Sequence, residues 1–471
     1  MHYLDLSFKS TKSFINEDFL LQNKISKILY HDYAKSMPII DYHNHISPKI
    51  ISDNKPFSSI NSAWLDEDHY KWRVMRALGI NENEITGDAP EKLKFKRWAQ
   101  AVPYTVRNPL FHWTHLELKR YFNINTLLQP STADKIFRQT NELISKMEPV
   151  EMLKKFNVKT LCTTDDPADD LEFHIKLSKN EKRLKVLPGF RPDNVLNICD
   201  ENYIEYINKL GSIDDTKIDS YESLLNSLSN RINFFHTNGC RISDHGLESL
   251  YSEQYSMLEI DKIFKNRLSG TIPNSKEDLQ FKSCVLFDLC EIYFKKGWTQ
   301  QFHLGAIRNN NISLLKKLGS GVGCDSIGDF TQAKAMSDFF NNLNSKGVLT
   351  NTIVYNLNPA MNEVFATMVG NFSSSKVSMQ FGTAWWYLDQ KDGMEKQINT
   401  LSNLGVLSNF IGMLTDSRSF LSFPRHEYFR RIICNMIGQD IKDGLLPNDT
   451  AFFGKMIQNI CYFNAEKFFK F

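Results

Sequence analysis

The sequence lacks the segments that mark a secreted or membrane-bound protein. It contains no apolar run of about 18 residues, so we expect no membrane-spanning helix. Residues 1–21 carry charged side chains throughout and no apolar core segment, so no secretory signal peptide is predicted. We therefore expect a cytoplasmic protein that has no membrane partner.

Paired cysteines and an excess of charge are also missing. None of the eight cysteines forms a CxxC pair, and their spacings match no zinc knuckle. In a chain of 471 residues we expect them to be reduced, mostly buried thiols. The 56 basic and 54 acidic residues give a formal net charge of +2, which offers no reason to expect nucleic acid as a partner.

What is present is a series of short apolar or β-branched runs, each followed by polar residues. The eight candidate strands cover residues 37–40, 158–162, 185–188, 239–242, 301–302, 352–355, 377–381 and 410–414. Helix-like stretches such as 172–182 and 203–210 lie between them. This alternation predicts an α/β fold with a parallel sheet, and eight units predict a closed (β/α)8 barrel. Barrels of this kind carry their chemistry at the carboxyl ends of the strands.

One long segment interrupts the alternation. Residues 48–150 show helical patterning without a clear strand, and they contain Trp64, Trp72, Trp98 and Trp113. We interpret the segment as a helical insertion after the first strand that covers one mouth of the barrel. The four tryptophans are expected to form its core, and residues 1–471 are expected to form a single barrel domain.

Two histidines follow the first predicted strand. Because side chains alternate along a strand, His43 and His45 are expected to point the same way, with Cα atoms roughly 7 Å apart. That spacing allows both imidazoles to bind one metal ion. A pair of polar residues at a strand end could also arise by chance, so this motif alone is a weak signal.

Longer motifs along the chain carry a more specific resemblance. They are DYHNHISP at 41–48, DHYKWR at 68–73, NPLFHWTH at 108–115, TTDDP at 163–167, FRPD at 190–193, SDHG at 243–246, HLGAIRNNN at 303–311, WW at 385–386 and LTDSRS at 414–419. Together they resemble the uronate isomerase (glucuronate isomerase) family of the amidohydrolase superfamily, from about residue 20 to the C-terminus. The resemblance implies carbohydrate metabolism: conversion of D-glucuronate to D-fructuronate and of D-galacturonate to D-tagaturonate.

This resemblance assigns roles to nine residues. One divalent metal ion is expected on His43, His45 and Asp416, with zinc as the default and manganese or iron as alternatives. Aldose–ketose isomerisation through a cis-enediol needs a base at C2, and Asp416 is the candidate. Tyr70 is the candidate proton shuttle between O1 and O2.

The remaining candidates recognise the small hexuronate substrate. Arg191 and Arg418 are expected to bind its carboxylate, because a planar guanidinium donates two parallel hydrogen bonds to such a group. His69, His303 and Trp386 are expected to contact sugar hydroxyls or a ring face. Whether His245 or His303 adds a metal ligand is left open by the sequence, as are the preferred epimer and whether the chain forms a homo-oligomer.

Two other functions remain open at this point. One is a metal-dependent hydrolase of the same superfamily, which a metal-bridging lysine at a strand end would favour. Lys159 and Lys185 lie at strand starts, so no such lysine is evident. The other is a non-catalytic sugar-acid-binding protein, which should have lost a metal ligand or Asp416.

Overall fold

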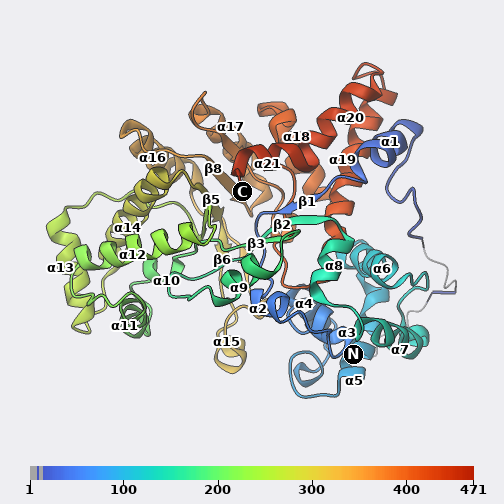
Figure 1. Cartoon of the computed structure of the whole chain (residues 1–471), viewed down its shortest axis with the longest axis horizontal. Coiled ribbons are helices and arrows are strands. Elements are labelled where there is room, and N and C mark those ends of the chain that lie inside the picture. The colour runs from blue at the N-terminus through green and yellow to red at the C-terminus, as the bar shows by residue number, and fades with distance from the viewer. Residues whose placement is uncertain (1–7, 10–13) are drawn as a thin grey trace.

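The structure is a computed structural model that describes residues 8–9 and 14–471. The segment 1–21, in which we expect no signal peptide, lies partly outside these residues. Seven parallel strands form the centre of the molecule (Figure 1). They are β1 (Ile39–Asp41), β2 (Val158–Cys162), β3 (Lys185–Leu187), β4 (Ile242–Leu247), β5 (Thr299–Leu304), β8 (Thr352–Asn356) and β9 (Met379–Phe381).

The strands follow one another around the centre in chain order. β1, β2 and β3 form one sheet, and β4, β5, β8 and β9 form another. Phe190 joins the two sheets, because it makes parallel bridges to Asp165 on one side and Ser243 on the other. The closed α/β barrel expected from the sequence is confirmed, with the segment after β9 completing the circle.

The eighth predicted strand, at residues 410–414, is not a regular strand, which corrects the expectation. Gly412 has a φ of +77° and Asp416 a φ of +46°, and these left-handed residues interrupt an extended ladder. The segment still closes the barrel beside β1, because the Asp416 N–H donates to the His43 carbonyl at 3.2 Å. On the same side, the His45 N–H donates to the Ser417 carbonyl at 3.0 Å.

Strand ends also differ from the prediction. The expected polar clusters after the fourth and fifth strands lie inside β4 and β5, which include Asp244, His245 and His303. Both strands are buried along most of their length and pair over six consecutive residues, so the ladder continues through the polar positions. By contrast, β1 ends at Asp41, before the two histidines.

A small antiparallel pair that the sequence analysis did not identify follows β5. It joins β6 (Ala306–Ile307) to β7 (Ser326–Ile327) and encloses α15 (Ile312–Leu318). Two-residue strands carry too little alternation to be recognised from sequence.

Helices occupy the insertion and the spaces between strands, as the sequence predicts. Between β1 and β2 lie α2 (Pro48–Asp53), α3 (Ile60–Trp64), α4 (His69–Ala77), α5 (Glu91–Ala101), α6 (Pro109–Phe122), α7 (Ala133–Ile144) and α8 (Pro149–Lys155). The barrel helices are α9 (Glu172–Asn180), α10 (Asp193–Leu196), α11 (Tyr203–Ile213), α12 (Tyr221–Thr237), α13 (Met257–Leu268), α14 (Ser275–Lys296), α16 (Gln332–Ser345), α17 (Asn362–Phe372) and α18 (Lys391–Leu404). The terminal helices are α1 (Lys24–Ile28), α19 (Pro424–Lys442), α20 (Thr450–Gln458) and α21 (Asn464–Phe469). In Figure 1 the insertion helices gather at the lower right and α11–α14 at the left.

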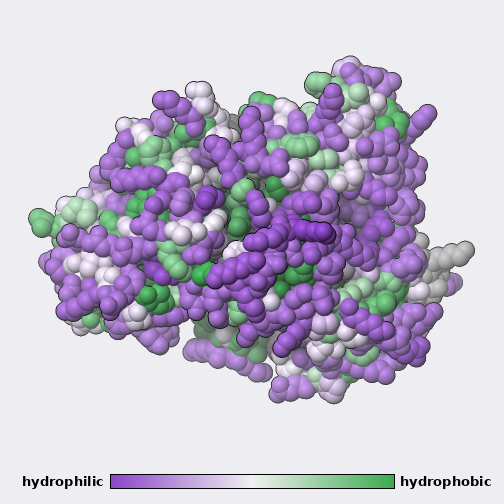
Figure 2. Space-filling view, in the orientation of Figure 1, coloured by the Kyte–Doolittle hydropathy of each residue, from purple (hydrophilic) through white to green (hydrophobic). Residues whose placement is uncertain are grey.

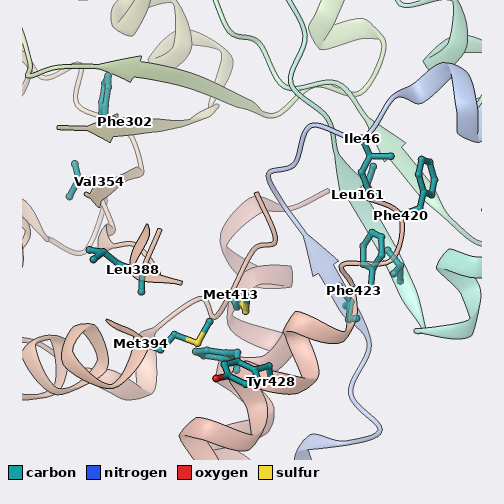
Figure 3. Close-up of a cluster of buried hydrophobic side chains, with 14 of the residues drawn as sticks. Ile46, Leu161, Phe302, Val354, Leu388, Met394, Met413, Phe420, Phe423 and Tyr428 are labelled. Carbon is teal, nitrogen blue, oxygen red and sulfur yellow. The ribbon is translucent and has the colours of Figure 1, made fainter. Parts of the chain in front are cut away.

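One continuous apolar core joins the barrel to the insertion. Figure 3 shows part of it, with Leu161 of β2, Phe302 of β5 and Val354 of β8 beside residues of the C-terminal third of the chain. The four tryptophans of the insertion belong to the same core and are at most 8% exposed. Their expected role as core residues is confirmed.

The face of the molecule drawn in Figure 2 is mostly hydrophilic. Figure 2 shows one face, on which the apolar side chains form small groups separated by polar ones. Within the described part of the chain, no helix combines the length and the apolar character that crossing a membrane requires. All eight cysteines are free thiols, and five of them are buried.

Candidate active site

One pocket at the carboxyl ends of the strands brings together residues from distant parts of the chain. Eight of the nine predicted site residues line it, and the exception is Tyr70. The full lining is His43, His45, His69, Arg191, His303, Arg308, Gly321, Asp325, Trp385, Trp386, Asp416 and Arg418.

The two histidines after β1 converge on Asp416. Nε2 of His43 and Nε2 of His45 each lie 3.1 Å from the same oxygen, Oδ1 of Asp416. The imidazole rings are 5.1 Å apart, so both point to one side although β1 has already ended. Backbone hydrogen bonds between residues 43–45 and residues 416–417 keep residues 43–45 extended. Their side chains therefore alternate as they would in a strand.

These three side chains fit a divalent metal ion. Their ligand atoms lie within 4.8 Å of one another. Ligands at about 2.1 Å from a tetrahedral ion are separated from one another by about 3.4 Å, close to the 3.1 Å between each histidine and Asp416. Burial alone would raise the pKa of Asp416, but hydrogen bonds from His43 and His45 hold it well below its ordinary value, so the carboxylate is charged.

The second oxygen of Asp416 has its own partner. The Trp385 indole N–H donates to Oδ2 at 2.7 Å, which fixes the plane of the carboxylate. Asp416 and Trp386 both have positive φ values, +46° and +53°, although neither is glycine. Strained backbone conformations of this kind persist only where the surrounding structure holds them, and they are concentrated at functional sites.

Asp244 of β4 organises the far side of the pocket. Its carboxylate accepts from Arg191 Nη1 at 2.9 Å, meets His303 Nδ1 at 2.6 Å and lies 3.7 Å from His43 Nδ1. Burial opposes ionisation of Asp244, but Arg191 and then His43 outweigh it and keep the pKa well below the ordinary value. His303 is itself buried, which lowers its pKa to about 4 and keeps the ring neutral.

The three arginines of the pocket differ in how firmly they are held. Arg191 is engaged by two carboxylates, since its Nε also donates to Asp193 at 2.8 Å. Arg418 donates to the Gly321 carbonyl at 3.1 Å, and Arg308 lies with its guanidinium carbon 4.7 Å from the Trp386 ring centre. Arg418 therefore has more donors to offer a ligand than Arg191.

Helix α4 brings His69 into the pocket and Tyr70 next to it. Asp68 caps the helix, because its side chain accepts from the backbone N–H groups of Tyr70 and Lys71. Burial and the nearby Arg418 charge lower the pKa of His69 to about 3. The Tyr70 ring lies 4.8 Å from the His69 ring, but its hydroxyl faces Asp389 rather than the metal ligands.

His245 lies outside the pocket. Side chains alternate between the two faces of β4, so Asp244 faces the site and His245 points away from it. The His245 ring stacks on Phe302, with the ring centres 5.3 Å apart. His245 belongs to neither group of potential metal ligands among the described residues, whereas His303 groups with His43 and Asp244. Asn44 also points elsewhere, and it donates to Asp41 at 3.0 Å.

Sequence reasoning missed four residues of this site: Asp244, Arg308, Asp325 and Trp385. All but Asp325 stand within the motifs quoted above, so a signal was present. Their contacts join positions far apart in the chain, such as Arg191 with Asp244 and Trp385 with Asp416, and single-sequence patterns do not reveal such pairs.

Comparison with known proteins agrees with this geometry. The profile of the family described as glucuronate isomerase matches residues 11–469. The chain belongs to the glucuronate isomerase family. It is therefore an isomerase, as the sequence predicts.

Individual relatives match nearly the whole chain. A protein of Flavobacterium johnsoniae named uronate isomerase is 52% identical over 98% of this chain and 100% of its own length. The crystal structure of a uronate isomerase from Thermotoga maritima superposes with a TM-score of 0.92 at 32% identity, over 97% of this chain and 99% of the other. A glucuronate isomerase structure from Caulobacter crescentus, 22% identical, shares the fold with a TM-score of 0.90 over 97% of each chain.

Proposed function

We propose that this chain interconverts D-glucuronate and D-fructuronate, and D-galacturonate and D-tagaturonate. The observation that carries the proposal is one pocket that contains both a His–His–Asp cluster and three arginines. The cluster suits a metal ion that polarises a carbonyl, and the arginines suit a carboxylate. The substrates named for the relatives above contain both groups.

His43, His45 and Asp416 would hold the metal, and zinc is the proposed ion because two imidazoles and a carboxylate are typical zinc ligands. The ion would act as a Lewis acid on the open-chain sugar. The free thiols of the chain are consistent with a cytoplasmic location, where such groups stay reduced.

Arg418 and Arg191 would bind the substrate carboxylate. Arg418 donates to a single carbonyl, so its other N–H groups can turn to a ligand. Arg191 is fixed by Asp193 and Asp244, which suits a rigid donor that needs no reorganisation when the sugar binds. His69, His303 and Trp386 would contact hydroxyl groups or a face of the sugar chain.

Proton transfer would use Asp416 and Tyr70. The ionised Asp416 takes the proton from C2 while Tyr70 gives its proton to O1, which produces a cis-enediol. Asp416 then returns its proton to C1 and Tyr70 recovers one from O2, leaving a ketone at C2. Trp385 keeps the Asp416 carboxylate in one plane through both steps.

The test is incubation of the purified protein with each uronate in D2O, with the products identified by NMR. We expect the ketose, carrying deuterium at C1 fully or in part, and a slower reaction of substrate deuterated at C2. Asp416→Asn should reduce turnover by orders of magnitude, on the scale of a lost general base, about 10²–10⁴-fold. An active Asp416→Asn variant together with a normal rate on C2-deuterated substrate would overturn this mechanism. Release of an acid, amine or alcohol from another substrate would instead indicate a hydrolase.

A further inference from the structure

A buried carboxyl group that the steps above do not use lies behind Tyr70. The Tyr70 hydroxyl donates to Oδ2 of Asp389 at 3.4 Å, and Asp389 is 4% exposed. Nη1 of Arg425, which is 1% exposed, lies 3.6 Å from the same oxygen. Two charged groups are thus buried next to one phenol, which is costly unless their arrangement is fixed.

The turn that carries Asp389 also carries two residues of the pocket. The short 3₁₀ turn Trp386–Leu388 places Asp389 at its end, where the Asp389 N–H donates to the Trp386 carbonyl at 3.2 Å. Trp385, just before the turn, donates to Asp416. The segment 385–389 therefore fixes the pocket-lining Trp386, the orientation of Asp416 and the group behind Tyr70.

Arg425 fixes the other end of this contact. It lies in the first turn of α19, and its guanidinium carbon is 4.0 Å from the Trp113 ring centre and 5.4 Å from the Tyr70 ring centre. Its Nη1 also approaches the carbonyl of Thr415 at 3.5 Å, the residue before Asp416. The Trp113 ring packs edge-on against Tyr70 at 6.1 Å, so the phenol is enclosed on several sides.

We propose that Asp389 is a positioning residue for Tyr70: it anchors the phenol hydroxyl at one point beside the pocket, and Arg425 holds its carboxyl group in place. The inference rests on the proposed role of Tyr70 as the proton shuttle. A phenol O–H rotates about its C–O bond, so a shuttle between two sugar oxygens needs a partner that limits this rotation. Small misplacements of such a group cost about 10²-fold in rate.

The surroundings also keep Tyr70 in the form that can give a proton. Burial, and then the Asp389 charge, raise the pKa of Tyr70 well above its ordinary value. Burial likewise raises the pKa of Asp389 to about 7, against the opposing effect of Arg425. Both pKa shifts follow from the burial of Tyr70 and Asp389 away from water.

A double-mutant cycle tests the inference on metal-loaded enzyme with D-glucuronate. The variants are Tyr70→Phe, Asp389→Leu and the double mutant, with metal content and melting temperature measured for each. The matched control is Asp392→Asn, an exposed carboxylate three positions further along the chain. If Asp389→Leu does not fold, Asp389→Ser replaces it, since serine is too short to reach the phenol. Asp389→Asn serves as the conservative variant.

We expect Asp389→Leu to lower kcat roughly tenfold to a hundredfold with KM within about twofold, because only the group that moves the proton is misplaced. Asp389→Asn should restore most of the rate, since an amide can still hydrogen-bond to the hydroxyl. In the Tyr70→Phe background the Asp389 substitution should change kcat less than about threefold.

Equal losses of kcat in both backgrounds, with Tyr70→Phe itself slow, would overturn the positioning role and leave the proposed function intact. A Tyr70→Phe variant with wild-type kcat would instead overturn the shuttle role, and the inference with it. A wild-type enzyme that leaves both uronates unchanged would overturn the proposed function itself.

Discussion

Arg191 and Arg418 line the same pocket but have different partners in the protein. Arg191→Met would leave Asp193 and Asp244 without their cation, so it would damage folding as well as binding. Arg418 gives up only a bond to a backbone carbonyl, so it is the cleaner test of carboxylate recognition.

For Arg418→Met we expect kcat/KM for uronates to fall roughly 30-fold or more. This corresponds to about 2 kcal/mol of lost transition-state stabilisation, because a charge-assisted hydrogen bond to the substrate is lost. Steady-state kinetics on both uronates measure this, with melting temperature as a check on folding. The wild-type enzyme should leave glucose and galactose unchanged, since they lack the carboxylate. Turnover of the neutral sugars at the uronate rate would contradict this assignment.

The proposed metal ligands give a second prediction for individual residues. Protein purified without chelator should contain up to one equivalent of a divalent transition metal, and the His43→Ala, His45→Ala double mutant should contain almost none. Elemental analysis measures both. His31→Ala is a suitable control, because His31 lies outside the pocket and pairs with Asp18 at 3.0 Å. Equal metal in the double mutant and the wild type would place the ion elsewhere.

For individual residues, the sequence indicated which side chains belong to the candidate site but not which distant residues they contact. The pair His43 and His45 could be read from spacing, because alternation depends only on local backbone geometry. Tyr70 was singled out too, but its contact with Asp389 joins positions on α4 and after Trp386, which only the closed barrel brings together. Asp244 was quoted in a motif without a role, because its partners Arg191 and His303 lie far from it in the sequence, after β3 and in β5.

At the scale of elements, the insertion contacts the segment between α15 and β7, two residues of which, Gly321 and Asp325, line the pocket. Arg73 of α4 donates to the carbonyls of Gly323 and Asp325 at 3.3 and 3.0 Å, and Arg76 donates to that of Val322. The sequence showed a glycine-rich segment at 319–323 but not what it touches. Strand prediction also failed where the backbone was irregular, as at residues 410–414, since the left-handed Gly412 is invisible to patterns of apolar residues.

Two glycines of this segment share a positive φ. Gly319 and Gly323 both have a φ of +84°, and Gly319 combines it with a ψ of −172°, so alanine at either position costs about 1–3 kcal/mol of backbone strain. They differ in surroundings, because a Cβ on Gly323 would lie 2.8 Å from the His69 carbonyl whereas Gly319 has open space.

We therefore expect both alanine variants to lose unfolding free energy from backbone strain, and only Gly323→Ala to change KM. The displaced His69 backbone should raise KM for uronates roughly tenfold, since a shift of about 1 Å in a binding group is felt strongly. Denaturant unfolding and steady-state kinetics on the two variants measure the difference. A KM that changes equally in both would show that strain, rather than contact with His69, is responsible.

For the molecule as a whole, the fold class followed from the sequence because eight recurring apolar runs and intervening helices leave few alternatives to a barrel. The energetic consequences of burial did not follow, because burial depends on the complete packing. Buried titratable groups are spread over the insertion, the barrel helices and the strands, and they act in opposite directions on stability.

Three histidines outside the pocket illustrate one direction. Burial lowers the pKa of His115 on α6, His174 on α9 and His245 on β4 to about 4 each. Because the unfolded chain binds the proton more tightly, each contributes stability that is present above about pH 6.5 and is lost as the pH falls towards 4. Asp165 acts in the other direction, since burial raises its pKa to about 7. Its contribution is present below about pH 4 and is lost as the pH rises through 7.

These opposed effects can be separated by measuring the free energy of unfolding at pH 5 and pH 7.5 for the wild type and two variants. His245→Phe keeps a ring stacked on Phe302 but removes the titrating group. Relative to the wild type, its free energy of unfolding at pH 5 should therefore rise by about 2 kcal/mol more than at pH 7.5. Asp165→Asn should shift the same difference by about 2 kcal/mol in the opposite sense, because the neutral carboxyl group no longer gains stability at low pH. Comparing the two pH values within each variant cancels any loss of packing that does not depend on pH. The absence of a shift in either variant would show that these buried groups titrate in the folded protein as they do in the unfolded chain. A shift of the same sign in both variants would contradict the direction of the pKa shift given for one of them.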